Sequence, residues 1–176
     1  ETFTGGINFN SGATFVILGT LGGSSWINVQ NGGVVEVAPS GEILNTCNFH
    51  LNNNSTLNNY GKVTYITGSV DGKIYNYNEM IFTQGASGNT VSINGTSTVE
   101  NHCKMTFNNK AHINGTLDNN SYLKFNNAFH VNGSGKLNLS ESSLTDVLGG
   151  TITIDGKVKN SNNAFARLDI DGASIG

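Results

Sequence analysis

The chain has 176 residues, the length of one ordinary domain, with a net charge of −3 and a composition of 23 Gly, 28 Asn and one Pro. Asn and Gly are poor helix formers, which excludes a helical bundle, and the scarcity of Pro excludes a collagen-like chain. Charged residues make up only 12% of the chain. The basic ones are scattered, and no apolar run is long enough to span a bilayer, so the sequence favours neither nucleic-acid binding nor membrane insertion.

The first predicted elements are short strands that recur in the N-terminal third of the chain. The apolar-x-apolar triplets at 7–9, 27–29 and 49–51 recur at shifts of 20 and 22. Alternation with a period of two predicts a strand with one buried face. Each triplet is followed at the same distance by a residue that tolerates a positive φ, namely Gly12, Gly32 and Asn54.

The pattern is weakest in the middle of the chain and becomes regular after it. Residues 68–90 fit the repeat poorly, which predicts a loop or a longer coil. Residues 103–138 divide into six blocks of six, each with an apolar-x-apolar core and a final Asn. These final residues are predicted to form a structural asparagine ladder: Asn108, Asn114, Asn120, Asn126, Asn132 and Asn138.

Three blocks make an 18-residue period, which predicts one triangular coil. The shift of 18 places Phe107 against Phe125, and Asp118 against Lys136. Asn119 occupies an inward position, where we expect a bulge or a local polar pocket. After a second stretch of weak register at 140–150, Ile152-x-Ile154 is another strand followed by a turn.

These periods predict an all-β fold, a single parallel β-helix (solenoid) over residues 1–176. Each coil, with a period of about 18–22, would contain three short strands, and eight or nine coils would fit the length. The variable coil length favours a right-handed helix. Neighbouring coils must supply each other's core, because one coil cannot bury its apolar stripe alone.

Aromatic residues gather in one region and form the candidate ligand site of the sequence. These are Tyr60, Tyr65, Tyr75 and Tyr77. Exposed aromatic rings bind sugar rings, but tyrosines buried in a wide coil explain the cluster equally well. Tyr75 and Tyr77 alternate on one face, which is either the outside or the inside of the coil.

Two pairs of residues are weak metal-site candidates. His112 and His130 occupy equivalent outward positions one coil apart, about 5 Å from each other, and solvated imidazoles are the simpler interpretation. Asp169 and Asp171 share an outward face of the last coil, where a Ca²⁺ site is open as a hypothesis beside a polar cap. We therefore expect no cofactor.

The two cysteines and the dispersed acidic residues do not predict a catalytic site. Cys47 and Cys103 could pair, bind a metal or be small buried residues, and the last interpretation is favoured. Acids are too dispersed to predict the clustered carboxylates of a polysaccharide lyase or hydrolase, so we expect no enzyme activity.

The amino-acid sequences of the repeats resemble those of a known class of proteins. LNNNSTLNNYGKV (51–63), VSINGTSTVENHCKMTFN (91–108) and FHVNGSGKLNLSES (129–142) are similar to the Asn/Gly-rich repeat regions of large secreted surface proteins of Bacteroidota. The resemblance implies a parallel β-helix, an extracellular location at the bacterial cell surface, export by the type IX system, and an adhesin-like or stalk role. No C-terminal sorting domain is present, so the chain is expected to be part of a larger polypeptide.

We therefore expect a non-enzymatic extracellular module that projects from the cell or adheres to glycans or a surface partner. One alternative is a carbohydrate-binding module that uses the four tyrosines. A second alternative is a scaffold that self-associates end to end, because open coil ends present unpaired strand edges.

Overall fold

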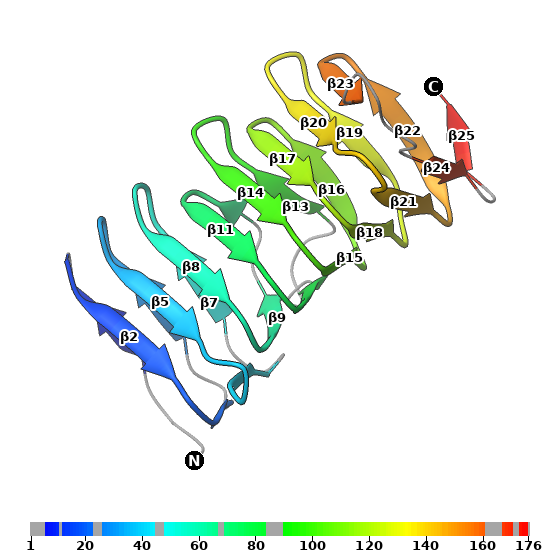
Figure 1. Cartoon of the computed structure of the whole chain (residues 1–176). Coiled ribbons are helices and arrows are strands. Elements are labelled where there is room, and N and C mark those ends of the chain that lie inside the picture. The colour runs from blue at the N-terminus through cyan, green and yellow to red at the C-terminus, as the bar shows by residue number, and fades with distance from the viewer. Residues whose placement is uncertain are drawn as a thin grey trace.

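The structure is a computed structural model that describes residues 6–10, 12–22, 26–44, 48–66, 69–83, 90–160, 167–170 and 173–175. Within these ranges every regular element is a β-strand, and the strands stack side by side along one axis from the N-terminal to the C-terminal end (Figure 1). All strand pairs in these ranges are parallel, which confirms the predicted β-solenoid with three strands per coil.

The first face of the solenoid is an eight-stranded sheet that runs through the described length without interruption. Its strands, in order, are β2 (Thr14–Ile17), β5 (Val34–Val37), β8 (Thr56–Asn59), β11 (Lys73–Asn76), β14 (Thr98–Asn101), β17 (Thr116–Asn119), β20 (Lys136–Leu139) and β23 (Lys157–Asn160). The burial of these strands alternates between inward and outward residues up to β20, as the period of two predicts.

The second face is an eleven-stranded sheet. Its main path is β1 (Ile7–Phe9), β4 (Trp26–Val29), β7 (Asn48–Leu51), β9 (Lys62–Ile66), β12 (Glu79–Thr83), β15 (Lys104–Phe107), β18 (Tyr122–Phe125), β21 (Leu144–Val147) and β24 (Arg167–Ile170). Two short strands, β3 (Thr20–Leu21) and β6 (Glu42–Ile43), pair beside this path, and β6 also pairs with β9.

The third face is a six-stranded sheet. Although β1, β4 and β7 pair within the eleven-stranded sheet, the six-stranded sheet follows directly after β7 along the rod axis. Its strands are β10 (Ser69–Val70), β13 (Thr90–Ile93), β16 (Lys110–Ile113), β19 (Phe129–Val131), β22 (Gly150–Ile154) and β25 (Ala173–Ile175). The backbone N–H of Asp71 donates to the carbonyl of Leu51 at 3.2 Å, which places the end of β7 against β10.

The solenoid has about seven turns, so the expected eight or nine coils were too many. The physical reason is that coil length varies more than the sequence suggested. The paired residues Asn59 and Asn76 have a sequence separation of 17, whereas Asn76 and its next partner Asn101 have one of 25. The number of residues between strands varies, while the strand registers stay continuous.

The two stretches of weak register are both built from regular strands. The described part of residues 68–90 contains β10, β11 and β12, and it spans the end of the coil with a separation of 17 and the start of the coil with a separation of 25. Residues 84–89 of this stretch lie outside the described residues. In 140–150, β21 pairs in continuous register with β18.

The core is a single apolar column enclosed by the three faces. Aromatic rings stack along it between successive coils, and Phe107 lies 5.1 Å from Phe125 between ring centroids, as predicted. Phe82 precedes them at 4.4 Å from Phe107, and Phe129 follows at 4.5 Å from Phe125. Each of these rings is almost wholly buried, so the coils are held together by side chains as well as by backbone hydrogen bonds.

The predicted turn residues lie where the sequence placed them. Gly12, Gly32 and Asn54 have φ values of 77°, 78° and 60°, at the same corner of three successive coils. Glycine reaches this left-handed region without strain, and Asn tolerates it better than most residues.

Candidate functional site

A ladder of four buried asparagines lies inside one corner of the solenoid. The four are the last residues of β8, β11, β14 and β17 in the eight-stranded sheet. The Nδ2 groups donate in one direction: Asn59 to Asn76 at 2.7 Å, Asn76 to Asn101 at 2.9 Å, and Asn101 to Asn119 at 2.9 Å. Asn119 then donates to the hydroxyl of Thr145 at 3.1 Å. All five side chains are fully buried.

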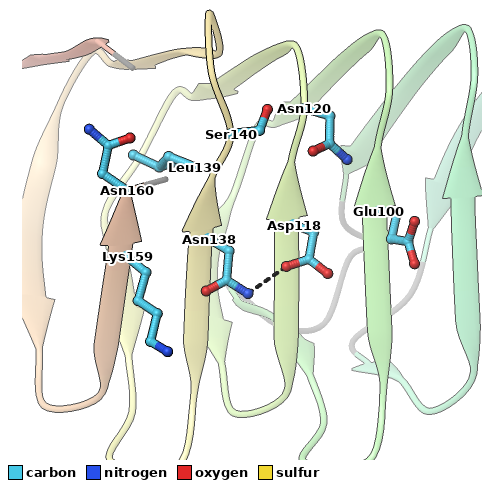
Figure 2. Close-up of a pocket in the computed structure, with 8 residues that line it drawn as sticks. All are labelled: Glu100, Asp118, Asn120, Asn138, Leu139, Ser140, Lys159 and Asn160. Carbon is cyan, nitrogen blue, oxygen red and sulfur yellow. Dashed lines mark hydrogen bonds between the residues drawn. The ribbon is translucent and has the colours of Figure 1, made fainter. Parts of the chain in front are cut away.

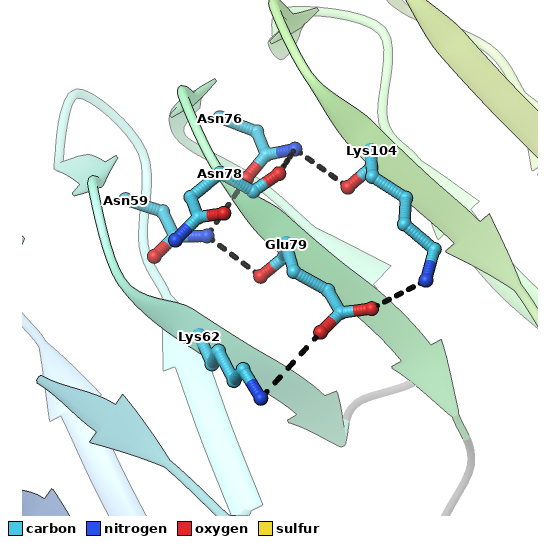
Figure 3. A network of polar contacts seen from close by, with 6 residues as sticks. All are labelled: Asn59, Lys62, Asn76, Asn78, Glu79 and Lys104. Atoms are coloured by element: carbon cyan, nitrogen blue, oxygen red, sulfur yellow. Dashed lines mark hydrogen bonds and ion pairs between the residues drawn. The ribbon is translucent and has the colours of Figure 1, made fainter. Parts of the chain in front are cut away.

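The second hydrogen of each ladder amide is also satisfied, by backbone carbonyls of the following strand (Figure 3). Asn59 donates to the carbonyl of Glu79, and Asn76 to that of Lys104, both at 2.9 Å. The ladder is therefore a complete network, which is the condition under which buried amides stabilise a core.

The predicted asparagine ladder is confirmed only in part. Asn126 donates to Asn108 at 2.7 Å, and Asn132 donates to Asn114, each across one 18-residue shift. Asn120 and Asn138 do not pair, because the shift between β17 and β20 is 20 rather than 18. Asn138 instead donates to Asp118 at 2.5 Å, so the expected Asp118–Lys136 pairing was also wrong.

The fully buried ladder was missed because the expected asparagines lie elsewhere: five directly follow a strand, and Asn138 faces outward within β20. The signal was present in the sequence: an apolar-x-Asn triplet ends β8, β11, β14 and β17. Asn119 forms no bulge, because it pairs in register with Asn101 and Leu139. The polar pocket expected around it is the ladder itself.

The four candidate tyrosines are separated by the fold into three environments. Tyr65 is fully buried in the aromatic core, 5.3 Å from Phe82, and cannot contact a ligand. Tyr60 and Tyr77 lie at a corner, 39% and 43% exposed, and Tyr75 is half-buried on the outer face of β11. The face that Tyr75 and Tyr77 share is therefore the outside of the coil.

Tyr60 and Tyr77 form an aromatic stack with His102 along the corner. The Tyr60 and Tyr77 rings lie 5.0 Å apart and almost parallel, and His102 continues the stack at 4.8 Å from Tyr77. Because ring faces cover one another, the middle of the stack presents ring edges to solvent. A sugar ring that stacks on an aromatic face finds no open face there.

A row of alternating charges lies across β9, β12 and β15 of the eleven-stranded sheet (Figure 3). The carboxylate of Glu79 lies 2.6 Å from Nζ of Lys104 and 4.0 Å from Nζ of Lys62. The hydrogen bond from Lys104 holds the pKa of Glu79 below its usual value. Each of the three side chains belongs to a different coil, so the row links three successive turns.

The two candidate histidines meet as predicted. His112 pairs with His130, and their rings lie 5.6 Å apart, edge to face. A carboxylate lies next to the second histidine: Asp155 Oδ2 is 2.7 Å from Nε2 of His130. Burial, followed by the positive charges of Lys110 and His130, lowers the pKa of His112.

In the described part of the chain, no group of three or more His, Cys, Asp or Glu side chains is arranged to hold a metal ion. Asp169 lies on β24, paired with Asp146 by its backbone, while Asp171 and Cys47 lie outside the described residues. Cys103 is a free, half-buried cysteine.

A shallow depression of about 390 Å³ lies on the outer face of the eight-stranded sheet, over β14, β17, β20 and β23 (Figure 2). Its polar lining includes Glu100, Asp118, Asn120, Asn138, Ser140 and Lys159. Glu100 lies 3.3 Å from Nε2 of His102. The sequence offered no signal for this site, because its residues come from four different coils.

The residues around this depression include no arrangement typical of acid–base catalysis. Glu100 and Asp118 are adjacent, but both are half-exposed on a flat sheet, and Asp118 accepts a hydrogen bond from Asn138. A carboxyl group that acts as a general acid is typically enclosed in a desolvated pocket. This open surface provides no such enclosure.

Among the described residues, no helix has the length and apolar character that a membrane crossing requires. Comparison of the chain with protein-family models, with curated proteins and with solved structures found no match.

Proposed function

We propose that this chain is a non-enzymatic β-helix module of an extracellular bacterial surface protein, with a stalk or adhesin-like role. The observation that carries the proposal is the axial continuity of the side chains: the buried asparagine ladder, the aromatic column and the charge row each link successive coils. Because these contacts join each coil to the next, the rod resists bending and keeps its outer faces in fixed register.

The chemistry of the polar surface supports the same role. Several acids are occupied by neighbours on adjacent strands: Asp146 accepts from the Tyr122 hydroxyl at 2.8 Å, and Asp155 lies against His130. Ladders of this kind stabilise sheets and need no substrate. The resemblance of the repeats to secreted surface proteins adds the extracellular location to the proposal.

Antibody labelling of the source cells tests the location and the role together. Intact cells should be labelled without permeabilisation, and deletion of the segment that encodes this chain should reduce attachment of the cells to a surface. Labelling that requires permeabilised cells would contradict the proposal. So would turnover of a common polysaccharide by the purified chain.

A second candidate function is end-to-end assembly, and apolar side chains near both ends of the described rod favour it. Leu18, in the first coil, is 69% exposed, and Ile154, in the register position of the inward residue Val131, is 45% exposed. In the described part of the chain, β2 and β23 are the edge strands of their sheet, and such edges can pair with another copy. Light scattering should show mass rising with concentration, and Leu18→Lys should abolish the rise; a concentration-independent monomer contradicts assembly.

A further inference from the structure

We propose that the depression over β14, β17, β20 and β23 binds a neutral oligosaccharide that lies across the strands, parallel to the rod axis. This site goes beyond the proposed surface role and does not use the exposed tyrosine stack. Four observations carry the proposal: the row of side chains at its floor, the arrangement of its two acids, the mixture of donors and acceptors, and its length.

The floor of the depression is one outward row of the eight-stranded sheet. Glu100 pairs with Asp118, Asp118 with Asn138, and Asn138 with Lys159. Figure 2 shows these four side chains side by side on adjacent strands, with the dashed Asp118–Asn138 hydrogen bond between two of them. Tyr75 precedes Glu100 in the same row, one strand earlier, and adds an aromatic ring at the end of the row.

The two acids have spare capacity to accept hydrogen bonds. Like charges on directly opposite positions of a sheet destabilise it. Glu100 has His102 as a neighbour at one oxygen, and Asp118 has Asn138 at one oxygen. Hydroxyl groups of a ligand that donate to both carboxylates would offset their repulsion.

The remaining lining selects the class of ligand. The amides of Asn120 and Asn138 and the hydroxyl of Ser140 both donate and accept, and a sugar hydroxyl does the same. A phosphate or sulfate would be repelled by the two acids. Leu139, the one apolar residue of the lining, is only 6% exposed, so polar side chains make up most of the rim.

The length of the row fits an extended chain of sugars better than a single one. From β14 to β23 the row crosses three strand spacings, about 14 Å in all. The depression is open on its outer side. A linear oligosaccharide of about three units can lie along such a row and continue past either end.

Calorimetric titration of the chain with neutral hexasaccharides of glucose, xylose, mannose and N-acetylglucosamine tests this site. At least one should bind. Glu100→Gln should weaken binding about tenfold, the loss expected for a hydrogen bond to a charged group, and Asn138→Ala about fivefold, the loss expected for a neutral one. Asp118→Asn, which keeps the shape of the side chain, should weaken it as well.

Matched controls lie on the eleven-stranded sheet, outside the depression. Glu42 on β6 and Asn28 on β4 are half-buried and face outward. Glu42→Gln and Asn28→Ala should leave binding unchanged, and circular dichroism should show all variants folded. The proposal is overturned if no neutral hexasaccharide binds at millimolar concentration, if only uronic-acid or sulfated oligosaccharides bind, or if the control variants lose as much affinity as the others.

Discussion

The side-chain amide of Asn101 donates to Oδ1 of Asn119 at 2.9 Å in the interior of the solenoid, where the corresponding residues of other coils are Val37 and Leu139. The same Nδ2 also donates to the carbonyl of Tyr122 at 2.8 Å. An amide in an apolar core costs free energy unless its hydrogen bonds are made. The stack supplies them, because the next coil brings an oxygen within reach.

Replacement of a residue in the middle of this ladder should destabilise the rod. We expect Asn101→Ala to lower the free energy of unfolding by about 3 kcal/mol, because it removes several buried hydrogen bonds and leaves polar partners unsatisfied. Urea denaturation measures the loss. The outward residue Asn58, replaced by Ala, should change the value by less than about 0.5 kcal/mol. Equal effects of the two substitutions would contradict a structural role for the ladder.

Close stacking of the corners predicts opposite results for two glycines. A Cβ on Gly115 would lie 2.2 Å from the carbonyl oxygen of Asn94 and 2.6 Å from that of Ser97, whereas a Cβ on Gly133 would meet no atom within 4 Å. Gly115→Ala should therefore cost about 2 kcal/mol or more, while Gly133→Ala should be neutral or slightly stabilising. Thermal unfolding distinguishes them, and a stable Gly115→Ala protein would show that the corners are looser than described.

The buried phenol of Tyr65 predicts a loss of stability in alkali. Burial raises the pKa of Tyr65 above the usual 10.0, so the folded state accepts only the neutral phenol. Its contribution is intact below pH 10 and declines as the pH rises above 10, where the unfolded chain ionises. Denaturation at pH 8 and pH 11 should show a smaller decline for Tyr65→Phe than for the wild type. The prediction fails if the two proteins decline in parallel.

The charge row predicts the opposite dependence in acid. The pKa of Glu79 is lowered by its hydrogen bond with Lys104, so its contribution is present above the usual value of 4.5 and is lost as the pH falls through the lowered pKa. Glu79→Gln should cost up to about 1 kcal/mol at pH 7 and nothing near pH 2. Added salt at about 1 M should shrink the difference at pH 7, since it screens partly exposed charges. A cost that is independent of pH and salt would point to packing instead.

Much of the fold could be predicted because the repeat is local. The positions of Gly12, Gly32 and Asn54 mark one corner in three coils, and the Phe107–Phe125 pairing follows from the 18-residue shift. The number of coils could not be predicted, because residues added at a corner change the period without changing the strands. The same effect moved Asp118 from its expected partner Lys136 to Asn138.

The candidate sites, too, were only partly predictable from the sequence. Each tyrosine of the cluster was visible in the sequence, but only the fold separates Tyr65, which is buried, from Tyr77, which stacks at a corner. The depression on the eight-stranded sheet was not visible at all, because Glu100 and Lys159 lie far apart in the sequence and share one surface only through the stacking of coils.

The sequence by itself determined the class of architecture, because a period of two and turn residues at regular spacing act between close neighbours in the chain. The tertiary structure decided which asparagines are buried, which aromatic rings are open and which polar side chains share a surface. Those outcomes depend on the register between coils, and the register is set by how many residues close each turn, a number that differs from one coil to the next.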